Sequence, residues 1–478
     1  VCVVCRSMPQ RSRSISFAVL LLALAMRVVV PIDYIADPDS LRFALALVNF
    51  DVVALQPHFP GYPVFVFLAS LMHTAGLTMP TLFALIGGFA TWVILLGFLR
   101  MVNTSIASKE GLVAAVLILF NPMIVVMSAR YMPDLLGAGV ALWVIVLSVR
   151  ERRPNETQIG LALLLAGLLA GIRLSYLPLV VLPVIAALIR SRKRIVHLAI
   201  GLVAVAVWLV PMIGLTGFDE FVGAAERQTK GHFTEFGGTI VTEPSVENRR
   251  IALVNALFID GFGATILSRS PTGFPLLLCL LLAGILGTWW LFGRDTDGLL
   301  IVILSISLYL AWVLLYQNII YQPRHILPLV PLILAPIWAG CVVAARRRRV
   351  ATVLVVAILA LTAITGIDLA IAQTRPTAIA QASEYLRSID RPVTIVSSGL
   401  VCTMLERTGV SHQCVDVATV DHLSISPRDT LVVTALPLKG GRDTIFYHRS
   451  NVNRIWPKLW IYGRTDKAGD SHSLEASP

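Results

Sequence analysis

Hydrophobic runs of roughly 17–25 residues, separated by short polar segments, dominate the chain. A helix needs about 20 apolar residues to cross the bilayer core, and in lipid its backbone polar groups must be satisfied within the segment. The runs therefore predict transmembrane helices. We expect them at about 15–32, 61–77, 80–102, 111–128, 133–149, 159–172, 175–190, 196–215, 274–292, 298–316, 325–345 and 350–371.

Three parts of the chain fall outside this pattern. Residues 1–14 are polar and basic and predict a cytoplasmic N-terminus, while residues 15–372 form the predicted membrane domain with loops at 33–57 and 216–273. In residues 373–478, β-rich runs alternate with helical patterns, which predicts a small α/β domain. The predicted fold is an all-α polytopic membrane protein with a C-terminal extracytoplasmic α/β domain.

The composition supports a membrane protein. Hydrophobic residues make up 56% of the chain and charged residues 14%, against about 25% charged residues in a soluble domain. The net charge of +11 comes largely from loops at 150–153, 190–194 and 346–349, which is the positive-inside pattern of cytoplasmic loops. This pattern requires no nucleic acid partner. It directs the loops at 33–57 and 216–273 and the C-terminal domain to the opposite face.

The same charge pattern sets the number of crossings. The loop at 33–57 and residues 130–134 should share the outer face, yet three apolar runs separate them, where an even number is needed. We expect a second crossing hidden in 80–102, split near Gly87 and Gly88, or else one run that is re-entrant. The first possibility raises the total from 12 to 13 transmembrane helices.

Cysteine and metal signals are weak. Cys2 and Cys5 form a C-x-x-C pair with no second pair to complete a zinc site. Cys402 and Cys414 can form a disulfide if the C-terminal domain faces an oxidising compartment. No cluster of histidine and carboxylate residues has metal-ligand spacing, so the sequence predicts no certain cofactor.

Carboxylates gather in the first outer loop. Asp33, Asp37, Asp39 and Asp51 stand there against the single base Arg42. Such carboxylates can be solvated, and Asp39 also occupies the N-cap position of a short predicted helix over 39–50. The alternative is catalytic, because a carboxylate here can take the proton from an acceptor hydroxyl that attacks a sugar.

A histidine and several arginines are placed unusually. His58 stands in a proline-rich turn that needs no histidine, and Arg130, Arg173 and Arg324 fall at the outer ends of predicted spans. Cations are normally biased to the inner face, and charge next to apolar spans suggests function. Asp134 follows Arg130 by four residues and can form a local ion pair with it. The arginines can bind an anionic phosphate or extend to lipid headgroups.

The long loop over 216–273 contains one further candidate, His232. It stands among a cation, aromatic residues and two glycines in the segment 230–238. This segment can form a flap over a donor site, or it can be a plain loop.

These motifs together resemble the GT-C superfamily of polyprenyl-phosphate-sugar-dependent membrane transferases. The similarity is greatest to the dolichyl-phosphate-mannose–protein mannosyltransferases and the bacterial lipid A aminoarabinose transferases, and it covers about residues 15–370. It rests on Asp-Ser-Leu-Arg-Phe at 39–43, His-Phe-Pro at 58–60, Ser-Ala-Arg at 128–130, and Arg-His-Ile-Leu-Pro at 324–328. Ser40 replaces the acid usual in the family, and the turn at 58–60 lacks one proline.

The resemblance implies an inverting sugar transfer at the extracytoplasmic face of the plasma membrane, with or without a divalent cation. Asp39, with Asp37 as a second carboxylate, would be catalytic. The residues that would bind substrate are His58, Arg130, Asp134, Arg173, His232, Arg324 and His325. The partners implied are a polyprenyl-phosphate-linked sugar, mannose-like or other, and an acceptor glycan, lipid or protein of the cell envelope.

Two other functions compete with the glycosyltransferase. A transporter or flippase for a lipid-linked substrate would place charges near the bilayer midplane, often in two related halves. Here the charges gather at one face and no repeat is present. A non-catalytic scaffold of envelope glycan assembly would explain the C-terminal domain, but not the outer carboxylates and arginines.

Overall fold

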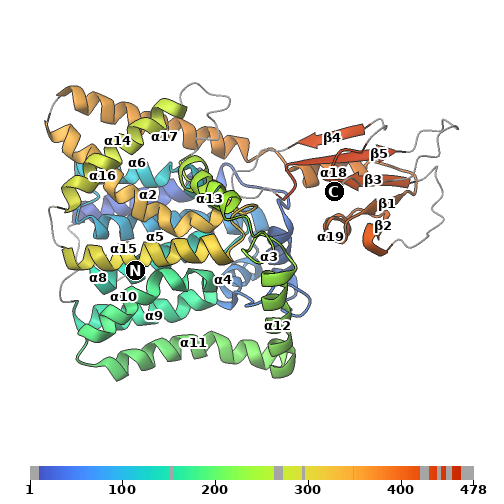
Figure 1. The fold of residues 1–478 in the computed structure, drawn as a ribbon, viewed down its shortest axis with the longest axis horizontal. Coiled ribbons are helices and arrows are strands. Elements are labelled where there is room, and N and C mark those ends of the chain that lie inside the picture. Colours follow the sequence, from blue (N-terminus) through green and yellow to red (C-terminus); the bar gives the residue numbers. More distant parts are fainter. Residues whose placement is uncertain are drawn as a thin grey trace. The chain divides into compact units, whose positions relative to one another are not determined.

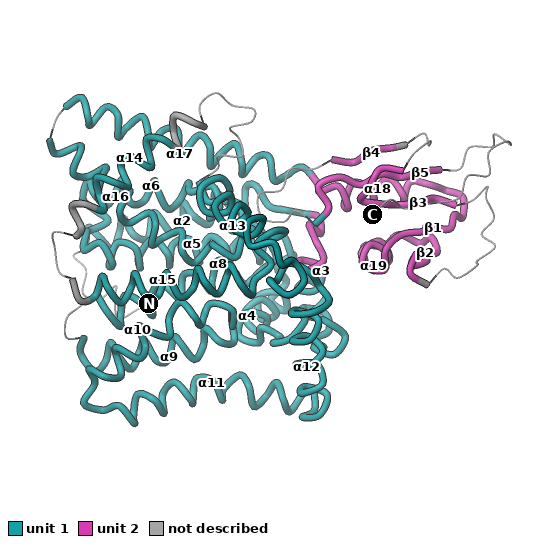
Figure 2. Tube along the Cα trace, viewed as in Figure 1, with its two compact units in different colours: residues 1–33, 42–375, 451–455 teal, residues 34–41, 376–450, 456–478 magenta. Residues whose placement is uncertain are grey.

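The computed structural model describes residues 10–150, 154–262, 273–292, 296–347, 349–419, 430–438, 443–447 and 455–463. The N-terminal pair Cys2 and Cys5 and most of the basic loop at 150–153 lie outside these residues. The chain divides into two compact units (Figures 1 and 2). The first comprises residues 1–33, 42–375 and 451–455, and the second residues 34–41, 376–450 and 456–478.

The first unit is helical (Figure 1). Its central helices pack in sequence order, α5 against α8, α8 against α9, and α9 against α11. The helices are α2 (Gln10–Val28), α4 (Pro63–Thr74), α5 (Met79–Met101), α6 (Lys109–Leu119), α7 (Pro122–Met127), α8 (Asp134–Val149), α9 (Glu156–Arg173), η1 (Leu174–Tyr176), α10 (Leu177–Arg190), α11 (Arg194–Thr216), α12 (Phe218–Thr234), α13 (Val246–Val254), η2 (Asn255–Asp260), α14 (Gly273–Phe292), α15 (Thr296–Tyr316), η4 (Pro323–Leu329), α16 (Val330–Arg347) and α17 (Arg349–Ala372).

The apolar helices make the chain a multi-pass membrane protein. Within the described ranges, six helical segments are long and apolar enough to cross a bilayer: Met79–Met101, Glu156–Arg190, Arg194–Thr216, Gly298–Tyr316, Pro323–Arg347 and Arg349–Ala372. The backbone leaves the helical region at Arg173 (φ −155°, ψ 87°), and α9 and α10 pack against each other, so two of the predicted runs remain distinct there. The total number of crossings stays a prediction.

Two expectations about the membrane unit are wrong. Helix α5 is continuous over its 23 residues, so residues 80–102 hide no second crossing. Gly87 instead lies against the backbone of Ser128, where a Cβ would collide with the Ser128 carbonyl. The segment 216–273 is also more than a loop, because it contains α12, α13 and the π-helix η2. Gly217, at φ 88°, lets the chain turn from α11 into α12.

The second unit is the predicted α/β domain, here with a five-stranded mixed sheet in the order β2-β1-β3-β5-β4. Strand β1 pairs in parallel with β2 and with the central strand β3, and β5 pairs antiparallel with β3 and β4. Cys402 and Cys414 form a disulfide. The elements are α18 (Ala378–Arg387), β1 (Thr394–Ser397), α19 (Gly399–Arg407), β2 (Gln413–Asp416), η5 (Val417–Thr419), β3 (Thr430–Thr434), β4 (Asp443–Tyr447) and β5 (Lys458–Gly463).

Candidate functional site

Three of the residues singled out in the sequence meet inside the first unit. Asp134 is the first residue of α8, Arg173 is the last residue of α9, and Arg324 lies in η4. One Asp134 oxygen, Oδ1, lies 3.0 Å from Arg173 Nη2 and 3.7 Å from Arg324 Nε. We call these three residues the arginine cluster. The start of α8 also suits a carboxylate, because helix N-termini stabilise negative charge.

The arginine cluster is almost completely buried. Asp134 is 1% exposed, Arg324 3% and Arg173 6%. Removing charges from water costs more than an ion pair usually returns, and charged residues within membrane segments mark functional sites. Their burial together therefore favours a site over the alternative of arginines that extend to lipid headgroups.

His58 is connected to the arginine cluster through a tyrosine. Arg173 Nη1 donates to the Tyr62 hydroxyl at 3.1 Å, and that hydroxyl lies 2.8 Å from His58 Nε2. Because the hydroxyl accepts from Arg173, it can donate its own proton to His58 Nε2. Phe43 packs edge-on against Tyr62, with ring centroids 5.0 Å apart. The turn at 57–62 thus attaches to the end of α9.

Two further tyrosines surround the cluster. The Arg173 guanidinium lies 5.9 Å from the Tyr176 ring centroid, and the Tyr176 and Tyr309 rings meet edge-on at 6.1 Å. The Tyr309 hydroxyl donates to the His325 carbonyl at 2.8 Å, which holds η4 beside α15. His325 therefore contributes its backbone here. The sequence analysis missed Tyr62, Tyr176 and Tyr309, although Tyr176 follows Arg173 by three residues.

Arg130 lies in the buried segment between α7 and α8 and is 3% exposed. The next residue, Tyr131, fixes this segment, since its hydroxyl donates to the Ile32 carbonyl at 2.6 Å and its ring stacks on Phe83. The spacing of Arg130 and Asp134 predicted a local ion pair, whereas the ion pairs described above join Asp134 to α9 and η4.

A second buried carboxylate, Asp260, was missed in the sequence analysis because it falls in the presumed long loop. It is 0% exposed and ends η2, a π-helix, which is a feature found frequently at functional sites. Helix η2 packs against η4, which carries Arg324. Asn121 Nδ2, at the start of α7, donates to the Gly261 carbonyl at 2.9 Å and ties the end of η2 to α7.

His232 contacts the end of α15. Its Nε2 lies 2.7 Å from the Tyr316 carbonyl, and burial lowers the pKa of its imidazole, with the hydrogen bond to Tyr316 opposing that shift. The fully buried Arg249 donates to the carbonyls of Leu314 (2.5 Å), Gln317 (2.9 Å) and Gly238. The segment 230–238 and Arg249 are therefore bonded to the end of α15, and the role of this segment as a flap stays a prediction.

The two candidate catalytic carboxylates begin α3 (Pro38–Val48). Asp37 Oδ1 accepts from the Ser40 backbone amide at 2.8 Å, so Asp37 caps the helix. The N-cap role expected of Asp39 is wrong, because Asp39 is the second residue of the helix and is half-buried. Both residues group with the second unit, and a catalytic role for either stays a prediction.

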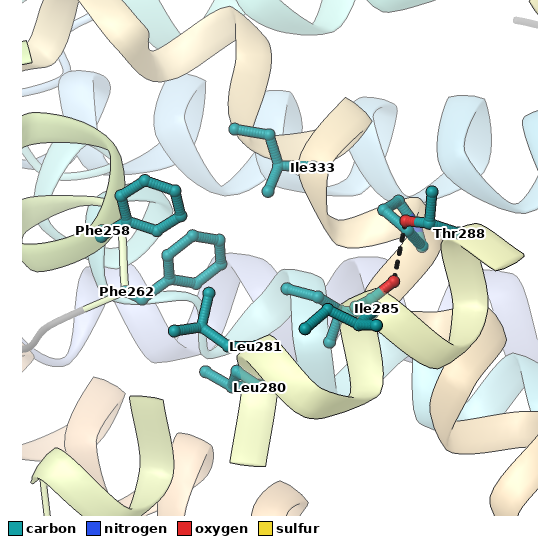
Figure 3. A pocket seen from close by; sticks show the side chains of 10 residues that line it. Phe258, Phe262, Leu280, Leu281, Ile285, Thr288 and Ile333 are labelled. Carbon is teal, nitrogen blue, oxygen red and sulfur yellow. Dashed lines mark hydrogen bonds between the residues drawn. The ribbon is translucent and has the colours of Figure 1, made fainter. Parts of the chain in front are cut away.

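An apolar groove lies between η2, α14 and α16 (Figure 3). Its volume is about 460 Å³, and its walls include Phe258, Phe262, Leu281, Ile285 and Ile333. The one hydroxyl in the wall, on Thr288, donates to the Gly284 carbonyl at 2.8 Å and is satisfied within its own helix. The lining therefore suits a hydrocarbon chain.

No group of three or more metal-ligating side chains is present among the described residues. The charged groups that do meet are arginines with a carboxylate, an arrangement that suits an anion rather than a cation.

No protein-family model and no curated protein matches this sequence. Similar solved structures include ArnT from Cupriavidus metallidurans, without ligand (16% identity, TM-score 0.47, 93% of this chain and 96% of that chain) and bound to undecaprenyl phosphate (14%, 0.46, 96% and 98%). Another is the oligosaccharyltransferase of Archaeoglobus fulgidus, in complex with zinc and sulfate (13% identity, TM-score 0.45).

The match to the oligosaccharyltransferase covers 84% of this chain but only 62% of the longer protein. Across these structures the identities are 13–16% and the TM-scores lie below 0.5.

Proposed function

We propose that this protein is a membrane glycosyltransferase that transfers a sugar from a polyprenyl-phosphate donor to an acceptor at the extracytoplasmic face. The observation that carries the proposal is the convergence of Arg173 and Arg324 on Asp134, all buried at the ends of membrane helices. Arginine presents a planar fork of donors that matches phosphate oxygens. With Arg130 buried on the adjoining segment, the site is built for an anionic headgroup.

In the proposed sugar transfer, negative charge develops on the leaving phosphate. The acceptor oxygen attacks the anomeric carbon, the bond from that carbon to the phosphate oxygen breaks, and the polyprenyl phosphate departs with the electron pair. Arginines placed beforehand stabilise the charge that grows on the phosphate. Asp134 holds Arg173 and Arg324 in place, and the Tyr62–His58 pair orients Arg173 from the other side.

A general base takes the acceptor's proton. We propose Asp39 for this role, with Asp37, whose carboxylate accepts from the Ser40 amide and caps α3, as the second candidate. The inverting course of the reaction, and the mannose-like or other identity of the sugar, belong to this proposal too.

The apolar groove would hold part of the polyprenyl chain. One of its walls is η2, which packs against the helix that carries Arg324, and Gly261 lies beside Ile326 at this contact. A cavity of about 150 Å³ accommodates one benzene ring. The groove, at about 460 Å³, therefore has room for several isoprene units.

The proposed position of the site at the outer face rests on the charge of the basic loops and on the length of α4. Helix α4 has 12 residues and spans about 18 Å, which is shorter than the roughly 30 Å of bilayer hydrocarbon. If α4 does not cross the membrane, two crossings rather than three separate the loop at 33–57 from Arg130. Arg130 then lies on the face opposite the basic loops, and no hidden crossing is needed. The Cys402–Cys414 disulfide also suits an oxidising, extracytoplasmic compartment.

A transfer assay tests the proposal. Purified protein in lipid is given polyprenyl phosphates that carry radiolabelled mannose, glucose, arabinose or aminoarabinose, with candidate acceptors, and release of polyprenyl phosphate is measured. We expect release by wild type and its loss in Arg324→Ala. Asp33→Asn is the matched control, because Asp33 is exposed in the same loop as the predicted base. Folded protein that moves a donor across the bilayer without releasing the sugar would refute the transferase and favour a flippase.

A further inference from the structure

Tyr176 lies beside the arginine cluster, and the ion pairs of the cluster do not account for its buried hydroxyl. Tyr176 is 0% exposed, and its hydroxyl has no hydrogen-bond partner among the described residues. Buried polar groups in folded proteins are nearly always hydrogen-bonded, so each exception requires a reason.

The neighbouring hydroxyls differ in this respect. The Tyr62 hydroxyl accepts a hydrogen bond from Arg173 and lies 2.8 Å from His58 Nε2, and the Tyr309 hydroxyl donates to the His325 carbonyl. Tyr176 packs edge-on against Tyr309 and is as deeply buried. Three tyrosines thus surround Arg173. Of their hydroxyls, that of Tyr176 is the one with no hydrogen-bond partner among the described residues.

The position of Tyr176 brings it to the charged groups. Gly137, three residues after Asp134 on α8, packs directly on the Tyr176 ring, where a Cβ would lie 3.2 Å from Tyr176 Cδ2. The Arg173 guanidinium lies 5.9 Å from the ring centroid.

We propose that the Tyr176 hydroxyl donates a hydrogen bond to an oxygen of the phosphate group that Arg173 and Arg324 bind. The inference rests on the proposed function and identifies a further residue of the same site. The oxygens of a phosphate group can accept from two arginines and one hydroxyl together. Tyr176 thereby helps to orient the phosphate.

The substitution Tyr176→Phe removes the hydroxyl and keeps the ring. Because that hydroxyl has no hydrogen-bond partner in the part of the chain that the structure describes, its loss should leave the thermal midpoint equal to or above that of wild type. Tyr309→Phe is the matched control, since it removes a hydroxyl that bonds the His325 carbonyl and should lower the midpoint. A purely structural role for Tyr176 predicts the same response in both variants.

The binding probe is undecaprenyl phosphate titrated into the protein in nanodiscs of a single phosphatidylcholine, with uncharged undecaprenol as the comparison. A hydrogen bond to a charged group is lost in the variant, so we expect Tyr176→Phe to bind the phosphate about tenfold or more weakly. Binding of undecaprenol should not change. Equal phosphate affinity in wild type and Tyr176→Phe would overturn this inference alone. Absence of phosphate binding by folded wild type would overturn the proposed function as well.

Discussion

The substitution Asp134→Asn tests how the arginine cluster is held together. It keeps the size of the side chain and removes the negative charge that Arg173 and Arg324 share. Both arginines are at most 6% exposed, so little water is available to replace the carboxylate. Breaking a buried ion pair by removing one partner costs about 3–5 kcal/mol. The favourable position of the charge at the start of α8 adds about 0.3–1 kcal/mol.

The assay is thermal and denaturant unfolding of the purified variants in one detergent. We expect Asp134→Asn to be destabilised by about 3–6 kcal/mol in total. Asp33→Asn removes an exposed carboxylate and should stay within about 0.5 kcal/mol of wild type.

A double mutant separates loss of the ion pair from loss of packing. In Asp134→Leu with Arg173→Met, both charges of the 3.0 Å pair are replaced by apolar groups. Such replacements are often neutral or stabilising, so the double mutant should regain much of the stability lost in Asp134→Leu. Transfer activity should stay absent, because the arginine is gone. Asp134→Asn within about 1 kcal/mol of wild type, or additive losses in the double mutant, would refute the reasoning.

Three further predictions concern other parts of the chain. The His232 pKa is lowered in the folded protein, so the unfolded chain binds more protons and stability should fall as pH drops below about 6.5. Thermal midpoints measured against pH test this, and the fall should disappear in His232→Gln. Cys402→Ser should destabilise the C-terminal domain by about 2–3 kcal/mol in urea unfolding without reductant, because Cys402 and Cys414 close a short loop; wild type with reductant should unfold like the variant. Asp39→Asn should abolish transfer with a thermal midpoint near that of wild type, and retained transfer would remove Asp39 as the base.

Much of the fold could be predicted from local patterns. The runs expected at 196–215, 298–316 and 350–371 agree within a few residues with α11, α15 and α17, because an apolar run of this length has one stable form in lipid. The alternation of helices and strands in the C-terminal domain was also predicted, since apolar alternation and turn residues are local signals.

Other elements escaped prediction because their causes are not local. Gly87 and Gly88 looked like a break in a helix, yet Gly87 serves the close approach of the Ser128 backbone to α5. Helices α12 and α13 are too polar to stand out as spans, and contacts from His232 and Arg249 to the end of α15 hold this segment.

The sequence by itself determined that arginines stand at the ends of apolar runs, because a charge beside a span is visible in one dimension. It did not determine their partner. Arg130 is four residues from Asp134, whereas Arg173 and Arg324 are 39 and 190 residues away, and these two meet the Asp134 carboxylate. Only the packing of α8 with α9 and η4 brings the three helix ends together. A buried charge must then pair with whatever charge that packing places beside it.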